Sequence, residues 1–291
     1  MPEKTEKNKT VGGTLYLVAT PIGNMADLSP RACKVLSEVD FIAAEDTRNT
    51  LRLLTGLGIK NTLISYHEHN KRARGEEIAV RLLAGESCAL VTDAGMPAIS
   101  DPGEDLVALC EGYHIPVTVV PGCCAAVSAL ALSGLPTRRF VFEGFLPTDH
   151  TERRARLSAL AREERTTILY EAPHRLRTTL AELLSALGNR RISICRELTK
   201  INEEIFRTTL QDACAHYAEK EPRGEFVLVL EGGTADAAAA APDATASLSP
   251  EEAVERYCSE GMARMDAIKR AARERGMSKS ELYRLLHHSE T

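Results

Sequence analysis

Residues 13–120 alternate short apolar runs with helix-like segments, and this alternation limits the possible folds more than any other feature of the chain. The segments carry helix start signals such as Ser29 followed by Pro30. The expected strands are 14–20, 41–44, 63–66, 88–92 and 117–120, and the expected helices are 31–39, 47–57, 71–84 and 104–111. Strands that alternate with helices form a largely parallel sheet with helices on its faces. The sequence therefore predicts an α/β fold.

Residues 121–232 form a second expected α/β domain. Pro121 and Gly122 break the first pattern, and a helix of small residues follows at 125–132. The further expected strands are 140–142, 167–170, 192–195, 205–208 and 226–230, and the further expected helices are 151–163, 174–187 and 210–218. Because there are fewer helices than strands, this sheet is predicted to be mixed.

The two ends of the chain differ from these domains in composition. Residues 1–12 predict a disordered tail, and residues 233–248, which are mostly Gly, Ala, Asp, Ser and Pro, predict a flexible linker. Residues 249–291 predict a helical domain of the helix-turn-helix type, with three short helices at 250–259, 263–275 and 278–287. Basic residues concentrate in its middle helix, at Arg264, Lys269, Arg270, Arg273 and Arg275.

Five loops that follow the strands of the first sheet are rich in Gly, Pro or acids. They are ATPIGN (19–24), AEDTR (44–48), SYHEHN (65–70), TDAGMPAISDPG (92–103) and VPGCCAA (120–126). Ligands of open α/β sheets bind outside the carboxyl ends of the strands, so these loops are expected to share one cleft. The loop 92–103 is too long for a solvent turn and predicts a shape held against a ligand. Gly23 allows close backbone approach.

Composition excludes several other classes of protein. The eight Cys and eight His lack ligand-like spacing, which predicts no metal site and favours buried thiols in a reducing cytoplasm. The chain has no apolar run long enough to span a membrane and no signal segment at its start. The net charge of -5 argues against nucleic-acid binding by bulk charge, but residues 138–200 carry 13 Lys and Arg against 8 Asp and Glu. This surplus predicts either one basic face or ordinary solvated helices.

The ordered motifs LYLVATPIGN, AEDTR, YHEHN, DAGMPAISDPG, VPGCCAAVSALALSGLP, FEGFLP, YEAPHR and GEFVLV resemble a bacterial family over about residues 13–232. The family is that of the ribosomal RNA small subunit methyltransferase I enzymes, within the tetrapyrrole methylase superfamily. One departure is visible, because the family often has Pro-Ser where this chain has Cys123 and Cys124.

The resemblance implies a class III methyltransferase of two α/β domains, usually a homodimer, with S-adenosyl-L-methionine in the cleft between the domains. It implies methylation of the ribose 2′-oxygen of a cytidine in the decoding region of 16S rRNA, on the RNA or on the small ribosomal subunit. Its cofactor contacts, carried over residue by residue, fall at Pro21, Asp93, Gly95, Met96, Cys124, Ala125, Phe145, Leu146, Tyr170 and Gly224.

A ribose hydroxyl is a poor nucleophile, so a base or a charge near the oxygen would assist methyl transfer. The candidates on the cleft loops are Glu45, Asp46, Arg48 and His67. We expect Glu45 or Asp46 to orient the hydroxyl and Arg48 to hold a phosphate. The alternatives are a local ion pair between Glu45 and Arg48, and a loop histidine without a catalytic role. The expected basic face around Arg48 consists of Arg153, Arg154, Arg156, Arg175 and Arg177.

Two other functions stay open on the residues alone. A tetrapyrrole methyltransferase would need a cleft for a macrocycle and no basic face. An inactive RNA-binding module would use the C-terminal basic helices, although the intact set of cofactor loops argues against it.

Overall fold

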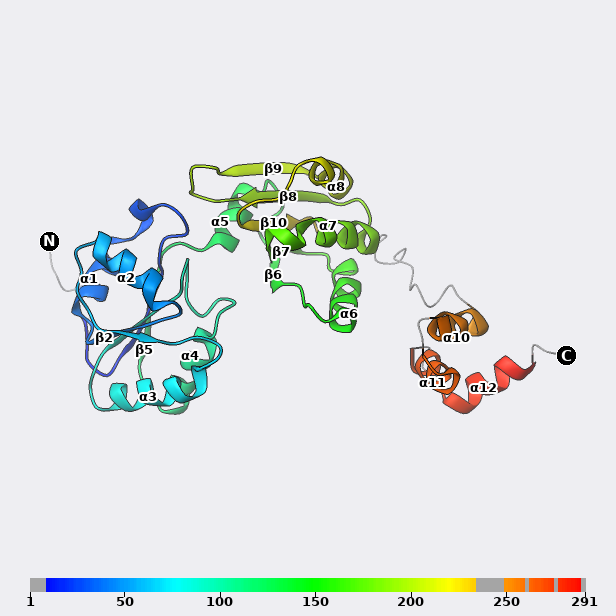
Figure 1. Cartoon of the computed structure of the whole chain (residues 1–291), viewed down its shortest axis with the longest axis horizontal. Coiled ribbons are helices and arrows are strands. Elements are labelled where there is room, and N and C mark those ends of the chain that lie inside the picture. Colours follow the sequence, from blue (N-terminus) through cyan, green and yellow to red (C-terminus); the bar gives the residue numbers. More distant parts are fainter. Residues whose placement is uncertain (1–8, 234–248, 260–261, 275–276, 289–291) are drawn as a thin grey trace. The chain divides into compact units, whose positions relative to one another are not determined.

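The computed structural model of the protein describes residues 9–233, 249–259, 262–274 and 277–288 (Figure 1). The chain divides into two compact units, residues 1–232 and 233–291. Most of the expected tail (1–8) and linker (234–248) lies outside the described residues.

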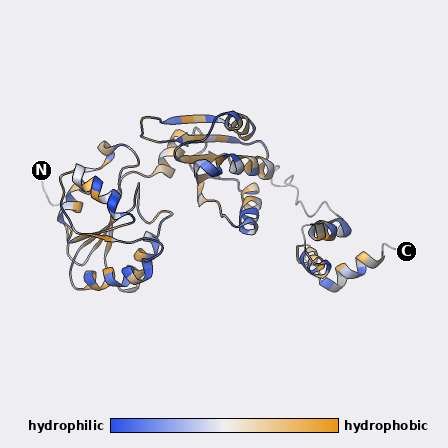
Figure 2. Cartoon of the chain, viewed as in Figure 1, coloured by the Kyte–Doolittle hydropathy of each residue, from blue (hydrophilic) through white to orange (hydrophobic). Residues whose placement is uncertain are grey.

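The first sheet is built from five parallel strands in the order β3-β2-β4-β1-β5. The prediction of a parallel sheet is confirmed. Its strands are β1 (Leu15–Val18), β2 (Phe41–Ala44), β3 (Leu63–Ser65), β4 (Cys88–Val91) and β5 (Val117–Val120). The central strands are buried on both faces, which explains why they are apolar runs without alternation. Figure 2 shows these strands in the hydrophobic colour, whereas the helices around them carry both colours.

Four helices cover the two faces of this sheet. They are α1 (Pro30–Glu38), α2 (Thr47–Gly56), α3 (Lys71–Leu83) and α4 (Gly103–Gly112). One core cluster joins α1 and α2 to the sheet, for example Leu36 and Leu54 against Val18. The other joins α3 and α4 to the opposite face, for example Ile78 and Leu106.

The neighbouring strands β1 and β4 lie at the switch point of the sheet. The chain leaves β1 for a helix on one face, through the short 3-10 helix η1 (Met25–Asp27), and leaves β4 for a helix on the other. The two loops therefore diverge, and such a point is where open α/β sheets bind ligands. An isolated antiparallel bridge between Thr20 and Gly95 joins the loops across it.

The second sheet is mixed, as expected, in the order β6-β7-β10-β8-β9. Only the β6–β7 pair is parallel, and the other three pairs are antiparallel. The strands are β6 (Phe140–Phe145), β7 (Thr166–Glu171), β8 (Arg191–Arg196), β9 (Glu204–Thr209) and β10 (Phe226–Leu230).

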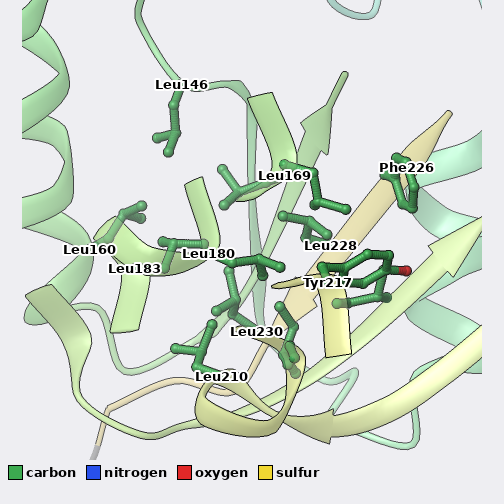
Figure 3. Packing of buried hydrophobic residues seen from close by; sticks show 14 of the residues in the cluster. Leu146, Leu160, Leu169, Leu180, Leu183, Leu210, Tyr217, Phe226, Leu228 and Leu230 are labelled. Atoms are coloured by element: carbon green, nitrogen blue, oxygen red, sulfur yellow. The ribbon is translucent and has the colours of Figure 1, made fainter. Parts of the chain in front are cut away.

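Side chains of β10 alternate between the two faces of this sheet. Phe226, Leu228 and Leu230 join the cluster of leucines drawn in Figure 3, which comes largely from α6 (His150–Ala161), α7 (Pro173–Leu187) and α8 (Leu210–Glu219). Val227 and Val229 pack instead with α5 (Ala125–Leu132). Ile22, from the loop after β1, belongs to this second cluster, so the two sheet regions share packing within the one compact unit 1–232.

The second unit consists of α10 (Pro250–Ser259), α11 (Arg264–Glu274) and α12 (Lys279–His288). Its first helix begins with a reciprocal capping box, in which Glu252 accepts from the Ser249 N–H at 2.6 Å and Ser249 accepts from the Glu252 N–H at 3.1 Å. Val254, Ile268 and Leu282 form part of its own core. Across the described part of the chain, no helix has the length and apolar character of a membrane span.

Candidate functional site

The loop between β4 and α4 is held in its shape by its own second acid. The Asp101 carboxylate accepts the N–H groups of Ala98, Ile99 and Gly103 at 3.0, 3.2 and 2.8 Å. Ala98 and Ser100 both adopt left-handed backbone conformations, with φ of 67° and 63°. Such conformations are costly for residues other than glycine and persist where surrounding contacts impose them. Asp101 therefore serves as an internal brace of the loop.

Gly95 is the point where three loops meet. Its φ is +88°, and its N–H and carbonyl bond to Thr20 at 3.2 and 2.9 Å. A Cβ at this position would lie 3.3 Å from Ile22 Cγ2 and 3.5 Å from the Cys123 carbonyl oxygen. The glycine thus lets the loop after β4 close against the loops after β1 and β5.

The second sheet approaches the loop between β4 and α4. A Cβ on Gly144, in the bulge of β6, would lie 3.0 Å from Ser100 Oγ.

Three carboxylates gather at the ends of the neighbouring strands β2 and β4. Glu45 Oε2 accepts the Thr92 hydroxyl at 2.6 Å. Asp93 accepts the Asp46 N–H at 3.2 Å and the side-chain amide of Asn49 at 3.1 Å. Burial raises the pKa of Asp93 and outweighs the hydrogen bond from Asn49, and the nearby Glu45 and Asp46 charges add to the rise.

Both carboxylate oxygens of Asp46 accept hydrogen bonds from Arg48. Asp46 caps α2 by accepting the Arg48 N–H at 2.8 Å, and its two oxygens accept the Arg48 guanidinium at 3.1 and 2.7 Å. The Arg48 side-chain hydrogen bond is the main reason that the pKa of Asp46 falls to about 2. The local ion pair considered for Glu45 is therefore made by Asp46 instead, while the Arg48 side chain stays 84% exposed.

His67 lies apart from the three carboxylates. It follows β3, at the edge of the sheet, and Asn70 accepts its backbone N–H at 2.8 Å. The Asn70 side-chain nitrogen also lies 3.3 Å from His67 Nε2. Within the described residues, no hydrogen bond or ion pair joins His67 to the carboxylates. Of the four expected catalytic residues, the structure brings together Glu45, Asp46 and Arg48.

Tyr170 connects the second sheet to the start of α5. Its hydroxyl accepts the Ala126 N–H at 3.2 Å, next to Cys124 and Ala125. Burial raises its pKa to about 12, so the hydroxyl stays protonated at neutral pH. Its ring contacts that of Phe145 at 5.6 Å between centroids, and Phe145 remains 52% exposed. Cys124 is the N-cap of α5 but makes no side-chain capping hydrogen bond.

Two of the expected cofactor contacts lie in unexpected surroundings. The Leu146 side chain is only 2% exposed and belongs to the leucine core (Figure 3), and its carbonyl accepts Arg175 at 2.6 Å. Its side chain therefore cannot line an open cleft. Gly224 has φ of +87°, and a Cβ there would lie 2.6 Å from the Glu197 carboxylate. The group that closely approaches Gly224 is therefore the Glu197 side chain of the same chain.

Comparison with known proteins decides the family. Residues 14–214 match the model of the family described as Tetrapyrrole (Corrin/Porphyrin) Methylases. A relative from Synechocystis named ribosomal RNA small subunit methyltransferase I is 48% identical over 277 residues, which cover 94% of this chain and 97% of the relative. The chain belongs to the ribosomal RNA small subunit methyltransferase I family. It is thus an enzyme of the methyltransferase class.

Two further comparisons bear on the architecture of this methyltransferase. A relative of the same name from Thermotoga maritima is 46% identical over 220 residues, which cover 76% of this chain and 99% of the relative. That relative is therefore shorter by about a quarter. A uroporphyrin-III C-methyltransferase structure from Thermus thermophilus, in complex with S-adenosyl homocysteine, has a TM-score of 0.53 at 20% identity and covers 75% of this chain and 97% of its own. The predicted superfamily fold is confirmed.

The sequence patterns did not reveal one loop that packs near the candidate site, residues 197–203 between β8 and β9. This loop packs on Gly23, where a Cβ would lie 2.4 Å from Lys200 Cγ and 2.8 Å from Thr199 Oγ1. The expected close approach at Gly23 therefore exists, but its partner is this loop. The two segments lie far apart in the sequence, and a local pattern could not pair them.

The expected basic face is wrong at Arg153, the one buried side chain of its five arginines in the second sheet region. Arg153 is buried and bonds to Glu182 and Thr179, each at 2.7 Å. Three of the others also have partners within the domain: Arg156 pairs with Glu143, Arg175 with Glu171 and Arg177 with the Tyr217 carbonyl. Arg154, Arg156 and Arg177 are all exposed, and Arg154 has no partner among the described residues. Arg153 therefore serves to hold α6 against α7.

No group of three or more His, Cys, Asp or Glu side chains in the described residues has an arrangement that could hold a metal ion. The arrangement at the strand ends instead offers carboxylate acceptors, one exposed guanidinium and main-chain groups of closely apposed loops.

Proposed function

We propose that this methyltransferase moves a methyl group from S-adenosyl-L-methionine to the ribose 2′-oxygen of cytidine 1402 of 16S rRNA in the small ribosomal subunit. The observation that carries the proposal is the convergence of the loops after β1, β4 and β5 at Gly95, directly at the switch point. Family membership supports the rRNA substrate.

The residues around Gly95 suit this cofactor. Bound S-adenosyl-L-methionine supplies an electrophilic methyl group on a sulfonium. Because Cys124 does not cap α5 with its side chain, the first-turn N–H groups other than that of Ala126 suit the carboxylate of the methionine part. Phe145 offers an exposed aromatic face for adenine, and Tyr170 holds that face and the α5 start in place. The cofactor set is completed by Pro21, Asp93, Met96, Ala125 and main-chain groups of Leu146 and Gly224.

Glu45 is the better choice of the two acids for orienting the ribose hydroxyl. Both oxygens of Asp46 accept hydrogen bonds from Arg48, and a carboxyl with a pKa of about 2 is a weak base. Glu45 uses Oε2 for Thr92 and Asp93, while Oε1 has no partner among the described residues. In this proposal Glu45 Oε1 accepts the hydroxyl hydrogen. Arg48, exposed beside it, contacts an RNA phosphate.

The proposal includes a cytoplasmic homodimer. All eight cysteines are free thiols, which favours a reducing compartment. Val127 and Phe140 of the second domain are 53% and 41% exposed, and apolar side chains of this kind suit a contact between copies. Sedimentation of the full chain at micromolar concentration tests the dimer.

The decisive experiment measures methyl transfer from labelled cofactor to small ribosomal subunits that lack the modification. A precorrin-type tetrapyrrole serves as the competing substrate. Label on the ribose of cytidine 1402 supports the proposal, whereas label on the tetrapyrrole alone would overturn it. Calorimetry on metal-stripped protein, with S-adenosyl homocysteine as competitor, tests cofactor binding separately.

A further inference from the structure

A groove of about 500 Å³ lies between the loop after β1 and the β8–β9 loop. Figure 1 shows these two segments, one from each sheet region of the first unit, approaching each other. The groove is lined by Gly23, Asn24, Met25, Thr199, Lys200, Ile201 and Asn202. Pro21 and the Thr20–Gly95 bridge belong to the same loop as Gly23, so the groove adjoins the proposed cofactor site without sharing its residues.

The β8–β9 wall of the groove is held in its shape by hydrogen bonds within the loop and to Glu225. Glu197 and Thr199 have φ of 52° and 66°, which is unusual for Glu and costly for a β-branched residue. Glu203 accepts the Thr199 N–H at 2.7 Å, and the Glu197 side chain accepts the Glu225 N–H at 2.9 Å. Strained backbone that is imposed by several contacts is typical of sites that hold a ligand.

The groove offers no free positive charge. Lys200 Nζ lies 2.9 Å from Glu197 and 3.0 Å from Glu225, so two carboxylates surround the single ammonium. A phosphate would meet a net negative neighbourhood here and would be repelled. The occupant should therefore be uncharged.

The remaining lining residues suit a flat, uncharged ring with polar edges. Asn24 uses Oδ1 to accept the Ala26 N–H at 3.0 Å, which leaves its Nδ2 as a donor. The side chain of Asn202 is exposed and has no partner among the described residues, so it offers both a donor and an acceptor. Met25 and Ile201 are 49% and 102% exposed and supply apolar surface. The Thr199 hydroxyl oxygen in the wall is buried without a hydrogen-bond partner.

We propose that this groove binds the base of an unpaired nucleotide that neighbours the methylated cytidine. The proposal rests on the proposed rRNA function. Single-stranded RNA is recognised through bases turned out of the stack, which make apolar contacts with their faces and hydrogen bonds with their edges. Asn24 and Asn202 bond the edge of the base, and Met25 and Ile201 contact its faces. The groove would thereby fix the register of the RNA relative to Glu45.

The test compares Ile201→Ala and Asn202→Asp with Val80→Ala. Val80 is 64% exposed on α3, away from both sites, and is the matched control. Steady-state methylation of unmodified small subunits should show KM for the subunit about tenfold higher in the two groove variants, the effect of one lost hydrogen bond or apolar contact. The affinity for S-adenosyl-L-methionine should be unchanged, because these residues lie outside the cofactor set.

Two further measurements identify the occupant. Chemical probing of base edges in the enzyme–subunit complex should show one base beside the target protected by the wild type and exposed with Asn202→Asp. Asn202→Lys should also weaken subunit binding, since Lys supplies no acceptor whereas the base edge uses both the donor and the acceptor of Asn202. Tighter binding by Asn202→Lys would mean that a phosphate lies in the groove and would overturn the proposal.

The outcomes separate this inference from the proposed function. If the wild-type enzyme does not methylate small subunits, the proposed function itself is wrong. If the wild type methylates subunits but the groove variants match Val80→Ala in KM and in base protection, only the proposed role of the groove is wrong.

Discussion

Two regions of the first unit concentrate charged side chains, and they use them differently. At the carboxyl edge of the first sheet, Glu45, Asp46 and Asp93 meet because parallel strands end at the same edge, and Arg48 beside them remains exposed. In α6 and α7 of the second domain, arginines such as Arg153 turn inward to partners on neighbouring elements.

The comparison indicates that strand topology, and not charge density, is the better guide to the proposed site in this methyltransferase. An exposed ion pair contributes little to stability, about 1 kcal/mol or less, whereas breaking a buried pair costs about 3–5 kcal/mol. Substitutions at the sheet edge should therefore change binding and catalysis, and substitution of the buried Arg153 should change folding.

Gly95→Val should have the largest effect, a loss of cofactor affinity of about 100-fold or more. Valine is strained at a φ of +88°, and its side chain would enter the contact with Ile22 and the Cys123 carbonyl. Calorimetry with S-adenosyl-L-methionine measures the loss, and circular dichroism reports whether the fold persists.

Gly58→Val is the matched control for this substitution. Gly58 has φ of +69° after α2, but nothing lies within 4 Å of its Cβ position. It should lose stability and keep cofactor affinity. Normal binding by Gly95→Val would show that the loop after β4 does not face the cofactor.

Arg153→Ala and Arg154→Ala, at adjacent positions of α6, should differ sharply in stability. Arg153 is 8% exposed at its side chain and bonds to Glu182, which is itself 34% exposed. Solvent near Glu182 reduces the cost of breaking the pair, so we expect a loss of about 2–3 kcal/mol. Arg154→Ala should change the free energy of unfolding by less than about 0.5 kcal/mol. Urea unfolding checks both, and equal losses would contradict the inward role of Arg153.

Arg48→Ala should lower methylation of small subunits about tenfold while leaving the free energy of unfolding nearly unchanged. Its guanidinium is exposed, and loss of one phosphate contact should also reduce by about 1 the slope of log affinity against log salt. Arg52→Ala, one helical turn away on α2, is the control. A salt slope that is the same for wild type and both variants would exclude Arg48 from RNA binding.

Asp46 and Asp93 should have opposite effects on the pH dependence of stability. The pKa of Asp46 falls to about 2, so its stabilisation is complete above the unfolded value near 4 and is lost as pH falls toward 2. The pKa of Asp93 is raised, so its ionised form destabilises the native state, and this penalty disappears as pH falls through the raised value. Unfolding of Asp46→Asn and Asp93→Asn between about pH 6 and pH 3 should therefore give differences from wild type that change in opposite directions. Parallel changes would contradict the assignment.

Local patterns predicted most of the fold, because the strands and helices here follow local periodicity and caps. The alternation of elements predicted the parallel sheet, and Ser249 with Glu252 predicted the start of α10. The resemblance predicted which loops bind the cofactor, but it could not show that the Leu146 side chain is buried. Side-chain direction depends on partners far along the chain, as in the pairing of Arg153 with Glu182, and no local pattern contains that information.

The smallest effect is expected from removing the second unit, residues 233–291. That unit has its own core, and the Thermotoga maritima relative carries the same family name in a chain about a quarter shorter. The first unit should therefore bind S-adenosyl-L-methionine with unchanged affinity when it is produced alone. Affinity for small subunits should fall a few-fold, because exposed basic side chains of α11, such as Lys269, would no longer contribute to RNA contact. Calorimetry and subunit binding at physiological salt measure the two affinities. Loss of cofactor affinity would show that the second unit is part of the cofactor site. Unchanged affinity for small subunits would show that the second unit does not contribute to substrate docking.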